Sequence, residues 1–113
     1  MNSRQLAFMV ISSLQKEITG AQIMYLDGAN AYTKTQAKAH NIIHNYLTVL
    51  KCESGEDLVA AKKFVNSESS ELIVIDSIGE SGFTKNMSEK EISQFLNSIL
   101  RDAKKSKVAV LVI

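Results

Sequence analysis

Short apolar segments alternate with longer amphipathic segments along this chain. Four runs rich in aliphatic and β-branched residues occupy positions 21–27, 46–52, 71–76 and 107–113, and we predict that each forms a strand. The last two runs are apolar at successive positions rather than at alternate ones. This pattern is typical of strands that are buried on both faces of a parallel sheet.

The segments between these runs have helical spacing. The first has residues at i, i+3, i+4, i+7 and i+8 that are apolar except for a serine at i+7. Two further apolar residues lie beside them, so we expect this helix to be buried on more than one side. We also predict helices over 33–45 and 54–66, and a fourth that begins at Ser88, where Glu91 completes a capping box. In the first helix, the residues with this spacing are Leu6, Met9, Val10, Ser13 and Leu14, and the two further apolar residues are Phe8 and Ile11.

Alternating helices and strands predict right-handed crossovers and a parallel sheet. We therefore expect an α/β protein with three αβα layers and about four strands, in which residues 1–113 form a single domain. The 113 residues are 45% hydrophobic, with 13 Lys and Arg against 12 Asp and Glu. This composition excludes a disordered acidic or basic chain, and the net charge does not identify the partner.

Localisation and redox state also follow from the sequence. The longest apolar run, 108–113, is far shorter than the roughly 20 residues that span a bilayer, and the N-terminal apolar stretch lacks a credible signal cleavage site. We expect a cytoplasmic protein. The single cysteine, Cys52, excludes an intramolecular disulfide and is most simply a buried thiol.

Polar residues close the predicted strands at the edge where ligands bind in open parallel sheets. Asp27 closes the first strand, Glu53 follows the second, and Asp76 with Ser77 closes the third. Four apolar residues followed by aspartate form a Walker B pattern, in which Asp76 and Ser77 would hold a metal ion or nucleotide. The alternative is that Asp76 caps a turn at the edge of the sheet.

Five segments of the chain resemble the ATPase core of RecA/RadA-type recombinases, in order and with similar spacing. The most specific of them is ELIVIDSIG, which resembles the Walker B strand. The others resemble the helix after the phosphate loop, the next strand and its aspartate, the helix before the Walker B strand, and the helix and strand that lead to the family's switch residue. In order along the chain, the segments are 6–17, 21–32, 53–65, 71–79 and 93–113.

The chain departs from this family at the catalytic positions. The phosphate loop would precede the first helix, and Ser3 and Arg4 occupy the places of its Lys and Thr; Ala29 stands where the family has its catalytic glutamate. The resemblance thus implies a module without autonomous ATPase activity, and we expect that the isolated chain is not an enzyme. No cofactor is expected for that chain, and Mg-ATP would be the cofactor only if the full core were restored.

Two further features carry weaker signals. His40 and His44 have the i, i+4 spacing of metal ligands, but no third ligand is evident, so we expect no metal site. The stretch 79–87 lies where the recombinases contact DNA, and its Gly82, Phe83 and Lys85 would form a DNA-binding loop. A surface loop that binds no DNA is the alternative, because Lys85 is its only cation.

These observations leave three functional hypotheses. The first is a module of DNA recombination and repair that acts on a recombinase subunit, on a second copy of itself, or on single-stranded DNA. The second is a regulatory or inhibitory module that binds proteins, as in a RecA-like inhibitor of cell division. The third is an excerpt of a complete DNA-dependent ATPase recombinase.

The resemblance also implies the strand order 46–52, 21–27, 71–76 and 107–113. In the family, the strand before the phosphate loop pairs with the counterpart of the last strand, so its omission leaves that strand unpaired on one side. The edge has no Pro, no Gly and no charge after Lys107. We therefore expect self-association through an interface that includes Val108, Val110 and Val112.

Overall fold

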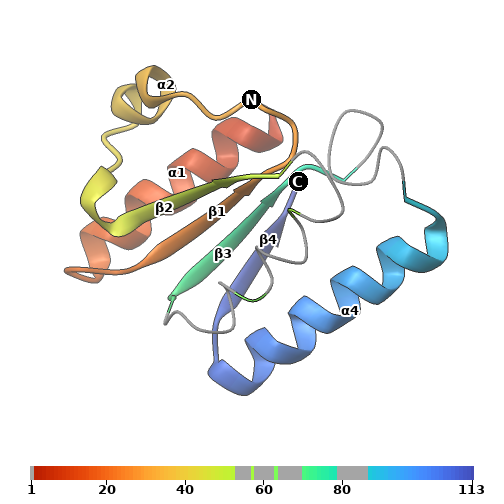
Figure 1. The fold of residues 1–113 in the computed structure, drawn as a ribbon. Coiled ribbons are helices and arrows are strands. Elements are labelled where there is room, and N and C mark those ends of the chain that lie inside the picture. The colour runs from red at the N-terminus through yellow and green to blue at the C-terminus, as the bar shows by residue number, and fades with distance from the viewer. Residues whose placement is uncertain (1, 53–56, 58–62, 64–69, 79–86) are drawn as a thin grey trace.

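Seven regular elements and one short 3-10 helix make up the described part of the chain. The computed structural model describes residues 2–52, 57, 63, 70–78 and 87–113. Figure 1 shows how the helices surround a central sheet. The elements are α1 (Ser3–Glu17), β1 (Ile23–Asp27), α2 (Lys34–Ala39), a 3-10 helix (His44–Tyr46), β2 (Leu47–Lys51), β3 (Leu72–Asp76), α4 (Glu89–Ser106) and β4 (Ala109–Val112).

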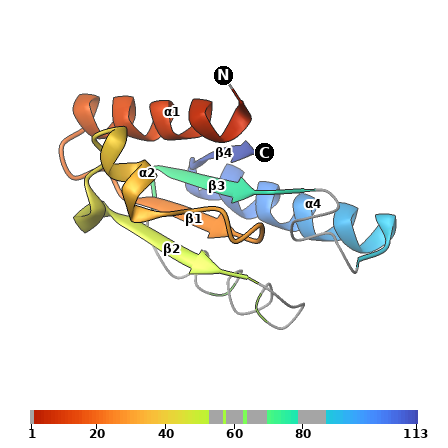
Figure 2. The same ribbon diagram turned by 90° about the horizontal axis from the view of Figure 1, so that it is seen from above.

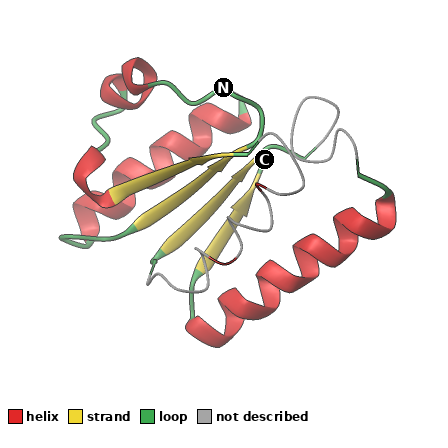
Figure 3. Ribbon diagram, viewed as in Figure 1, coloured by secondary structure: helices red, strands yellow, loops and turns green. Residues whose placement is uncertain are grey.

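The four strands form one parallel sheet in the order β2-β1-β3-β4 (Figure 3). Every residue of β1 and β3, the two central strands, is buried, whereas the outer strands are half-buried to exposed. The predicted α/β class, the parallel sheet of four strands and the strand order are all confirmed. The continuous apolar run of β3 indicated burial on both faces correctly, because this strand is central. The same expectation for the last run is wrong, because β4 is an outer strand whose residues are half-buried to exposed.

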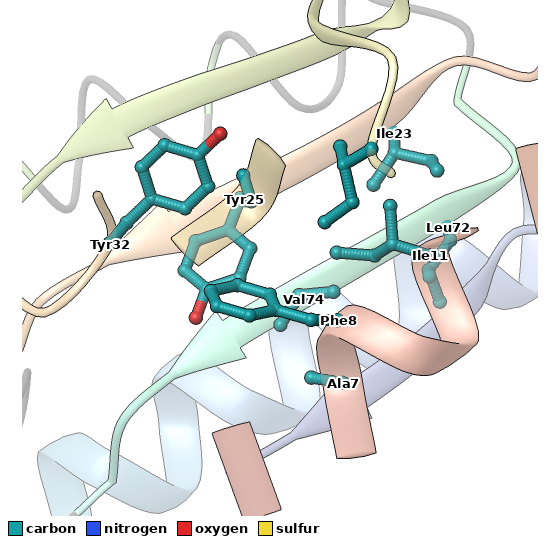
Figure 4. Close-up of a cluster of buried hydrophobic side chains, with 10 residues drawn as sticks. Ala7, Phe8, Ile11, Ile23, Tyr25, Tyr32, Leu72 and Val74 are labelled. Carbon is teal, nitrogen blue, oxygen red and sulfur yellow. The ribbon is translucent and has the colours of Figure 1, made fainter. Parts of the chain in front are cut away.

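Alternate strand residues supply two cores on opposite faces of the sheet. Ile23 and Tyr25 of β1 contribute to the core beneath α1 and α2, which also contains Phe8 (Figure 4). Met24 and Leu26 contribute to the second core, beneath α4. Figure 2 shows α1 and α4 on opposite sides of β3 and β4.

α1 is buried on one face only, so the expectation of burial on more than one side is wrong. Its buried residues are Ala7, Phe8, Ile11, Ser12 and Gln15. The stripe expected to face the core is largely exposed: Leu6 is 50%, Met9 43% and Val10 38% exposed. Because α1 packs on the sheet from one side, only one arc of its surface is covered by the described residues.

The second predicted helix is shorter than expected. α2 ends at Ala39, and Asn41 has a φ of 61°, a left-handed conformation that ends the helix before the 3-10 turn. The third predicted helix, 54–66, lies outside the described residues except for Asp57 and Lys63, which are helical.

The fourth predicted helix is confirmed as α4. The Ser88 hydroxyl accepts a hydrogen bond from the Glu91 N–H at 3.2 Å, and the Glu91 carboxylate accepts one from the Ser88 N–H at 3.1 Å. This is the capping box that the sequence indicated. In the part of the chain that the structure describes, α4 and the other helices are too short or too polar to cross a membrane.

Candidate functional site

Two buried aspartates lie side by side at the carboxyl ends of the central strands. Asp27 closes β1, Asp76 closes β3, and their Cα atoms are partners in the parallel register. Their relative exposures are 1% and 0%. The sequence therefore placed both aspartates correctly at this edge of the sheet.

Arg4 binds both oxygens of the Asp76 carboxylate. Its Nε donates to Oδ2 at 2.6 Å and its Nη2 donates to Oδ1 at 2.7 Å. Arg4 lies in the first turn of α1, where the capping box between Asn2 and Gln5 begins the helix. A planar guanidinium that meets a carboxylate at two points is the geometry expected of a strong ion pair.

Tyr25 is the third group at this carboxylate. Its hydroxyl donates a hydrogen bond to Oδ2 of Asp76. Burial, and then the hydrogen bond to Asp76, raise the pKa of the Tyr25 phenol far above its usual range, so the phenol stays protonated and acts as a donor. The Asp76 carbonyl accepts from the Gly28 and Ala29 N–H groups at 2.6 and 3.2 Å, and the peptide bond between Asp76 and Ser77 is cis.

Asp27 has a different set of partners. The Lys51 ammonium of β2 forms an ion pair with Oδ2 of Asp27, and the N–H groups of Tyr32 and Ala31 donate to the same carboxylate at 3.0 and 3.2 Å. Burial favours a higher pKa for Asp27, but the hydrogen bonds from Lys51, Tyr32 and Ala31 outweigh it and lower that pKa. Asp27 is thus held as an anion.

The roles of Arg4 and Lys51 were not recognised from the sequence. Lys51 is the Cα partner of Asp27 in the register between β1 and β2. Once the strand order is known, a lysine and an aspartate at the ends of neighbouring strands predict an ion pair. Arg4 lies 72 positions from Asp76 and offered no local signal.

Several aromatic rings cluster around Tyr25, the tyrosine that binds Asp76. The Tyr32 ring centre lies 5.3 Å from that of Tyr25 and 6.0 Å from that of Phe8. The Tyr32 hydroxyl is 2.8 Å from Nε2 of His44, and the His40 ring lies 5.5 Å from that of Phe8. A hollow of about 470 Å³ opens beside Tyr32, lined also by Lys34, His44, Leu47, Val49 and Lys51.

The two histidines do not form a metal site with each other in this arrangement. His44 contacts Tyr32, whereas His40 packs on Phe8. Among the described residues, no group of three or more His, Cys, Asp or Glu side chains is placed to hold a metal ion.

The residues at this edge do not fit a magnesium-nucleotide site. Both oxygens of Asp76 are bound by Arg4, so a metal ion there would have to displace the guanidinium and lie next to its positive charge. Ser77 is half-buried beside Asp76. The residues expected to form a DNA-binding loop, Gly82, Phe83 and Lys85, lie outside the described residues.

The residues expected at an interface lie on or beside β4, an outer strand of the described sheet. Val110 and Val112 belong to the strand, and Val108 precedes it. Val108 and Val110 are half-buried and pack against the core beneath α4, whereas Val112 is 42% exposed.

Comparison with known proteins gives a single kind of information, a likeness of fold. No protein-family model and no curated protein match the chain. Among solved structures, the chain is similar to SulA from Pseudomonas aeruginosa, with 12% sequence identity, a TM-score of 0.68, and coverage of 96% of this chain and 82% of that chain.

This finding corrects the resemblance to RecA/RadA-type recombinases and the functions that it implied. SulA is a cell division inhibitor, not a recombinase ATPase core. The expected role in DNA recombination and repair, and the expected place among the P-loop NTPases, are therefore wrong. The resemblance was misleading because the pattern of apolar residues followed by aspartate has more than one use. The aspartate can form an ion pair, as Asp76 does with Arg4, or it can belong to a Walker B site. What the comparison supports is a fold similar to that of SulA.

Proposed function

We propose that this chain is a regulatory protein that acts by binding another protein, and that it inhibits cell division. The observation that carries the proposal is the likeness to SulA, which extends over 96% of this chain. A regulator of this kind needs a stable surface and no catalytic group, because its effect comes from occupying its partner.

The carboxyl edge of the sheet supports this proposal. Asp27 and Asp76 are bound by Lys51 and Arg4, so these four charges hold the elements together instead of facing a substrate. Their ion pairs join β1 to β2 and α1 to β3. The edge thus acts as structural support for the surfaces around it.

A group of exposed apolar side chains at the amino end of the sheet is a candidate contact surface. Ile18, Ile43 and Tyr46 are 42%, 47% and 36% exposed. The Gln15 side chain holds Ile43 next to the end of α1 by bonding its N–H and its carbonyl oxygen, at 2.8 and 2.9 Å. We call these three residues the amino-end patch, and we propose that they contact the partner protein.

The proposal is tested by raising the level of the chain in its native host and measuring cell length. We expect division to stop while growth continues, which gives filaments many times the normal length. The double variant Ile43→Lys/Tyr46→Lys should restore normal length, because two added charges in the contact surface oppose binding.

Met9→Lys is the matched control, since Met9 is 43% exposed on α1 and lies outside the amino-end patch. Cells with this variant should still form filaments. Cells of normal length at a high level of soluble, folded wild-type chain would overturn the proposed function. Filaments that persist with the double variant would overturn the assignment of the amino-end patch.

A further inference from the structure

The hollow beside Tyr32 lies over one face of β2, an outer strand of the described sheet (Figure 2). Leu47, Val49 and Lys51 line it, and alternate residues of one strand share a face. Leu47 and Val49 pack against the core beneath α1 and α2, so they form an apolar floor. At about 3.3 Å per residue, the three side chains extend over about 13 Å of the strand. The hollow is therefore long enough for several residues of an extended chain.

Two lysines supply positive charge to this hollow. The Lys51 ammonium has three N–H donors, of which one binds the buried Asp27 carboxylate and one binds the Tyr32 carbonyl oxygen at 3.2 Å. Within the described part of the chain the third donor has no partner, and the Lys51 side chain is 46% exposed. Lys34, the first residue of α2, is exposed and forms no ion pair with a described residue. None of the described residues that line the hollow is acidic, so the hollow favours an anionic ligand.

The contacts of Tyr32 fix the wall of the hollow in the absence of a ligand. Its hydroxyl is 2.8 Å from Nε2 of His44, and its ring centre is 5.9 Å from the Lys51 ammonium. Its backbone N–H donates to the Asp27 carboxylate at 3.0 Å. A ligand therefore meets side chains that are already ordered, which reduces the entropic cost of binding.

The outer backbone groups of β2 are available to a further strand. The Cys52 N–H donates to the Asp27 carbonyl oxygen of β1 at 2.9 Å. Successive residues of a strand direct their backbone groups to opposite sides, so the groups of Val49 and Lys51 point away from β1. In the part of the chain that the structure describes, β2 has a neighbouring strand on one side only. An extended segment can thus add to this edge and place alternate side chains at the hollow.

We propose that the hollow and the outer edge of β2 bind an extended acidic segment of the partner protein. A carboxylate of this segment binds the third donor of Lys51 and faces Lys34. An apolar side chain two residues away in the segment packs on Leu47 and Val49. This spacing follows from strand geometry, because Val49 and Lys51 are also two residues apart on one face. The inference rests on the proposed function, since it assumes that the chain acts on another protein.

Two observations favour such a segment over other occupants. The hollow continues the amino-end patch, because His44 and Leu47 line the hollow while Ile43 and Tyr46 belong to the patch. A partner that covers the patch therefore reaches the hollow directly. A second copy of the chain is disfavoured, because a two-fold interface would bring the same lysines together from both sides.

An NMR titration of the isotope-labelled full chain tests this inference. The probe is a blocked heptapeptide in which threonine alternates with isoleucine, glutamate and isoleucine, so an apolar residue lies two positions from the glutamate in either direction. We expect the amide signals of Val49 and Lys51 to shift at about 1 mM probe. The signals of Thr48 and Leu50, which face β1, should shift less. A probe with glutamine in place of glutamate should bind about fivefold more weakly.

Lys34→Glu should weaken binding of the glutamate probe about tenfold, because it reverses a charge at the hollow. Lys38→Glu is the matched control, since Lys38 is an exposed lysine of the same helix and does not line the hollow. Both variants change the net charge equally, and the control should bind as the wild type does. Val49→Pro removes an outward N–H and should also weaken binding, with circular dichroism to show that this variant is folded.

Three results would overturn the inference: no shift of Val49 and Lys51 at about 5 mM probe, equal affinity for the two probes, or equal weakening by Lys34→Glu and Lys38→Glu. Shifts caused by a short oligothymidylate and not by the glutamate probe would assign the hollow to nucleic acid and also overturn it. The purified chain is titrated independently of cell length. Filaments without probe binding would overturn this inference alone, and probe binding without filaments would overturn the proposed function alone.

Discussion

Arg4 and Asp76 form a two-point ion pair that ties the first turn of the first helix to the centre of the sheet. The two hydrogen bonds measure 2.6 and 2.7 Å, Asp76 is fully buried, and the Arg4 side chain is 29% exposed. The pair bridges two residues 72 positions apart. It therefore links the first helix to a strand that is distant in the sequence.

The first prediction is that Arg4→Met lowers the free energy of unfolding by about 3 kcal/mol. Removing one partner leaves a buried carboxylate without its countercharge, and the partial exposure of Arg4 places the cost at the lower end of the range for buried pairs. Urea denaturation at pH 7 measures this change in the free energy of unfolding.

The double variant Arg4→Met/Asp76→Leu is the control for this prediction. It should be more stable than Arg4→Met alone, because no unpaired charge remains in the core. Equal stability of Arg4→Met and the wild type would show that the ion pair contributes nothing to the fold.

The second prediction concerns the ionisation of Tyr25. Burial and the hydrogen bond to Asp76 raise the pKa of its phenol far above the usual range, so Tyr25 should not ionise while the chain is folded. Ultraviolet titration of the wild type and of Tyr25→Phe should therefore give the same phenolate signal up to the pH at which the chain unfolds. A smaller signal in Tyr25→Phe before unfolding would contradict the position of Tyr25 in the ion-pair network.

The third prediction is a pH dependence of the ion pair between Lys51 and Asp27. The pKa of Asp27 is lowered in the folded state, so the pair stabilises the fold above the unfolded-state pKa, near 3.8, and this stabilisation is lost as the pH falls further. Lys51→Met should cost about 1 kcal/mol at pH 7, since the lysine side chain is 46% exposed and partly screened.

The difference between Lys51→Met and the wild type should shrink toward pH 2.5, measured by urea denaturation at both pH values. Lys34→Met is the matched control, because Lys34 is an exposed lysine near the same hollow. It should change stability by less than about 0.5 kcal/mol at either pH. A cost for Lys51→Met that does not vary with pH would show that Asp27 is not the partner.

The parts of the fold that could be predicted are those that short stretches of sequence determine. Continuous apolar runs identified the strands, and the capping box at Ser88 identified the start of α4. Asp27 and Asp76 were correctly placed at one edge because parallel strands end on the same side. Each of these inferences needs only a few neighbouring residues and one general rule.

The inferences that failed required information about distant residues. The arc of α1 that packs on the sheet depends on rings such as Tyr25 and Tyr32, which lie against Phe8 but outside the helix. The apolar residues of α1 lie on more than one side of the helix, so their pattern did not determine which side is buried. Asp76 followed an apolar strand as a metal ligand would, and only the three-dimensional structure places Arg4 on it.

The fourth prediction is that the Cys52 thiol is inert in the folded chain. Cys52 is 3% exposed, and burial, with smaller contributions from Asp57 and Asp27, raises the pKa of its thiol to about 11. Because the thiolate is the reactive form, alkylation by iodoacetamide at pH 8 should be at least a hundredfold slower in the folded chain than in urea. Equal rates would show that Cys52 is accessible in the native state.

The last prediction is that the isolated chain does not hydrolyse ATP and binds Mg-ATP no more tightly than about 1 mM. Arg4 occupies both oxygens of Asp76, so the carboxylate cannot coordinate a metal ion unless the ion pair breaks. Isothermal titration of the wild type and of Asp76→Asn measures the affinity, and Lys34→Met reports nonspecific attraction of the phosphates to an exposed lysine. A micromolar affinity that Asp76→Asn abolishes, while Lys34→Met leaves it intact, would show that Asp76 serves a nucleotide site despite its ion pair with Arg4.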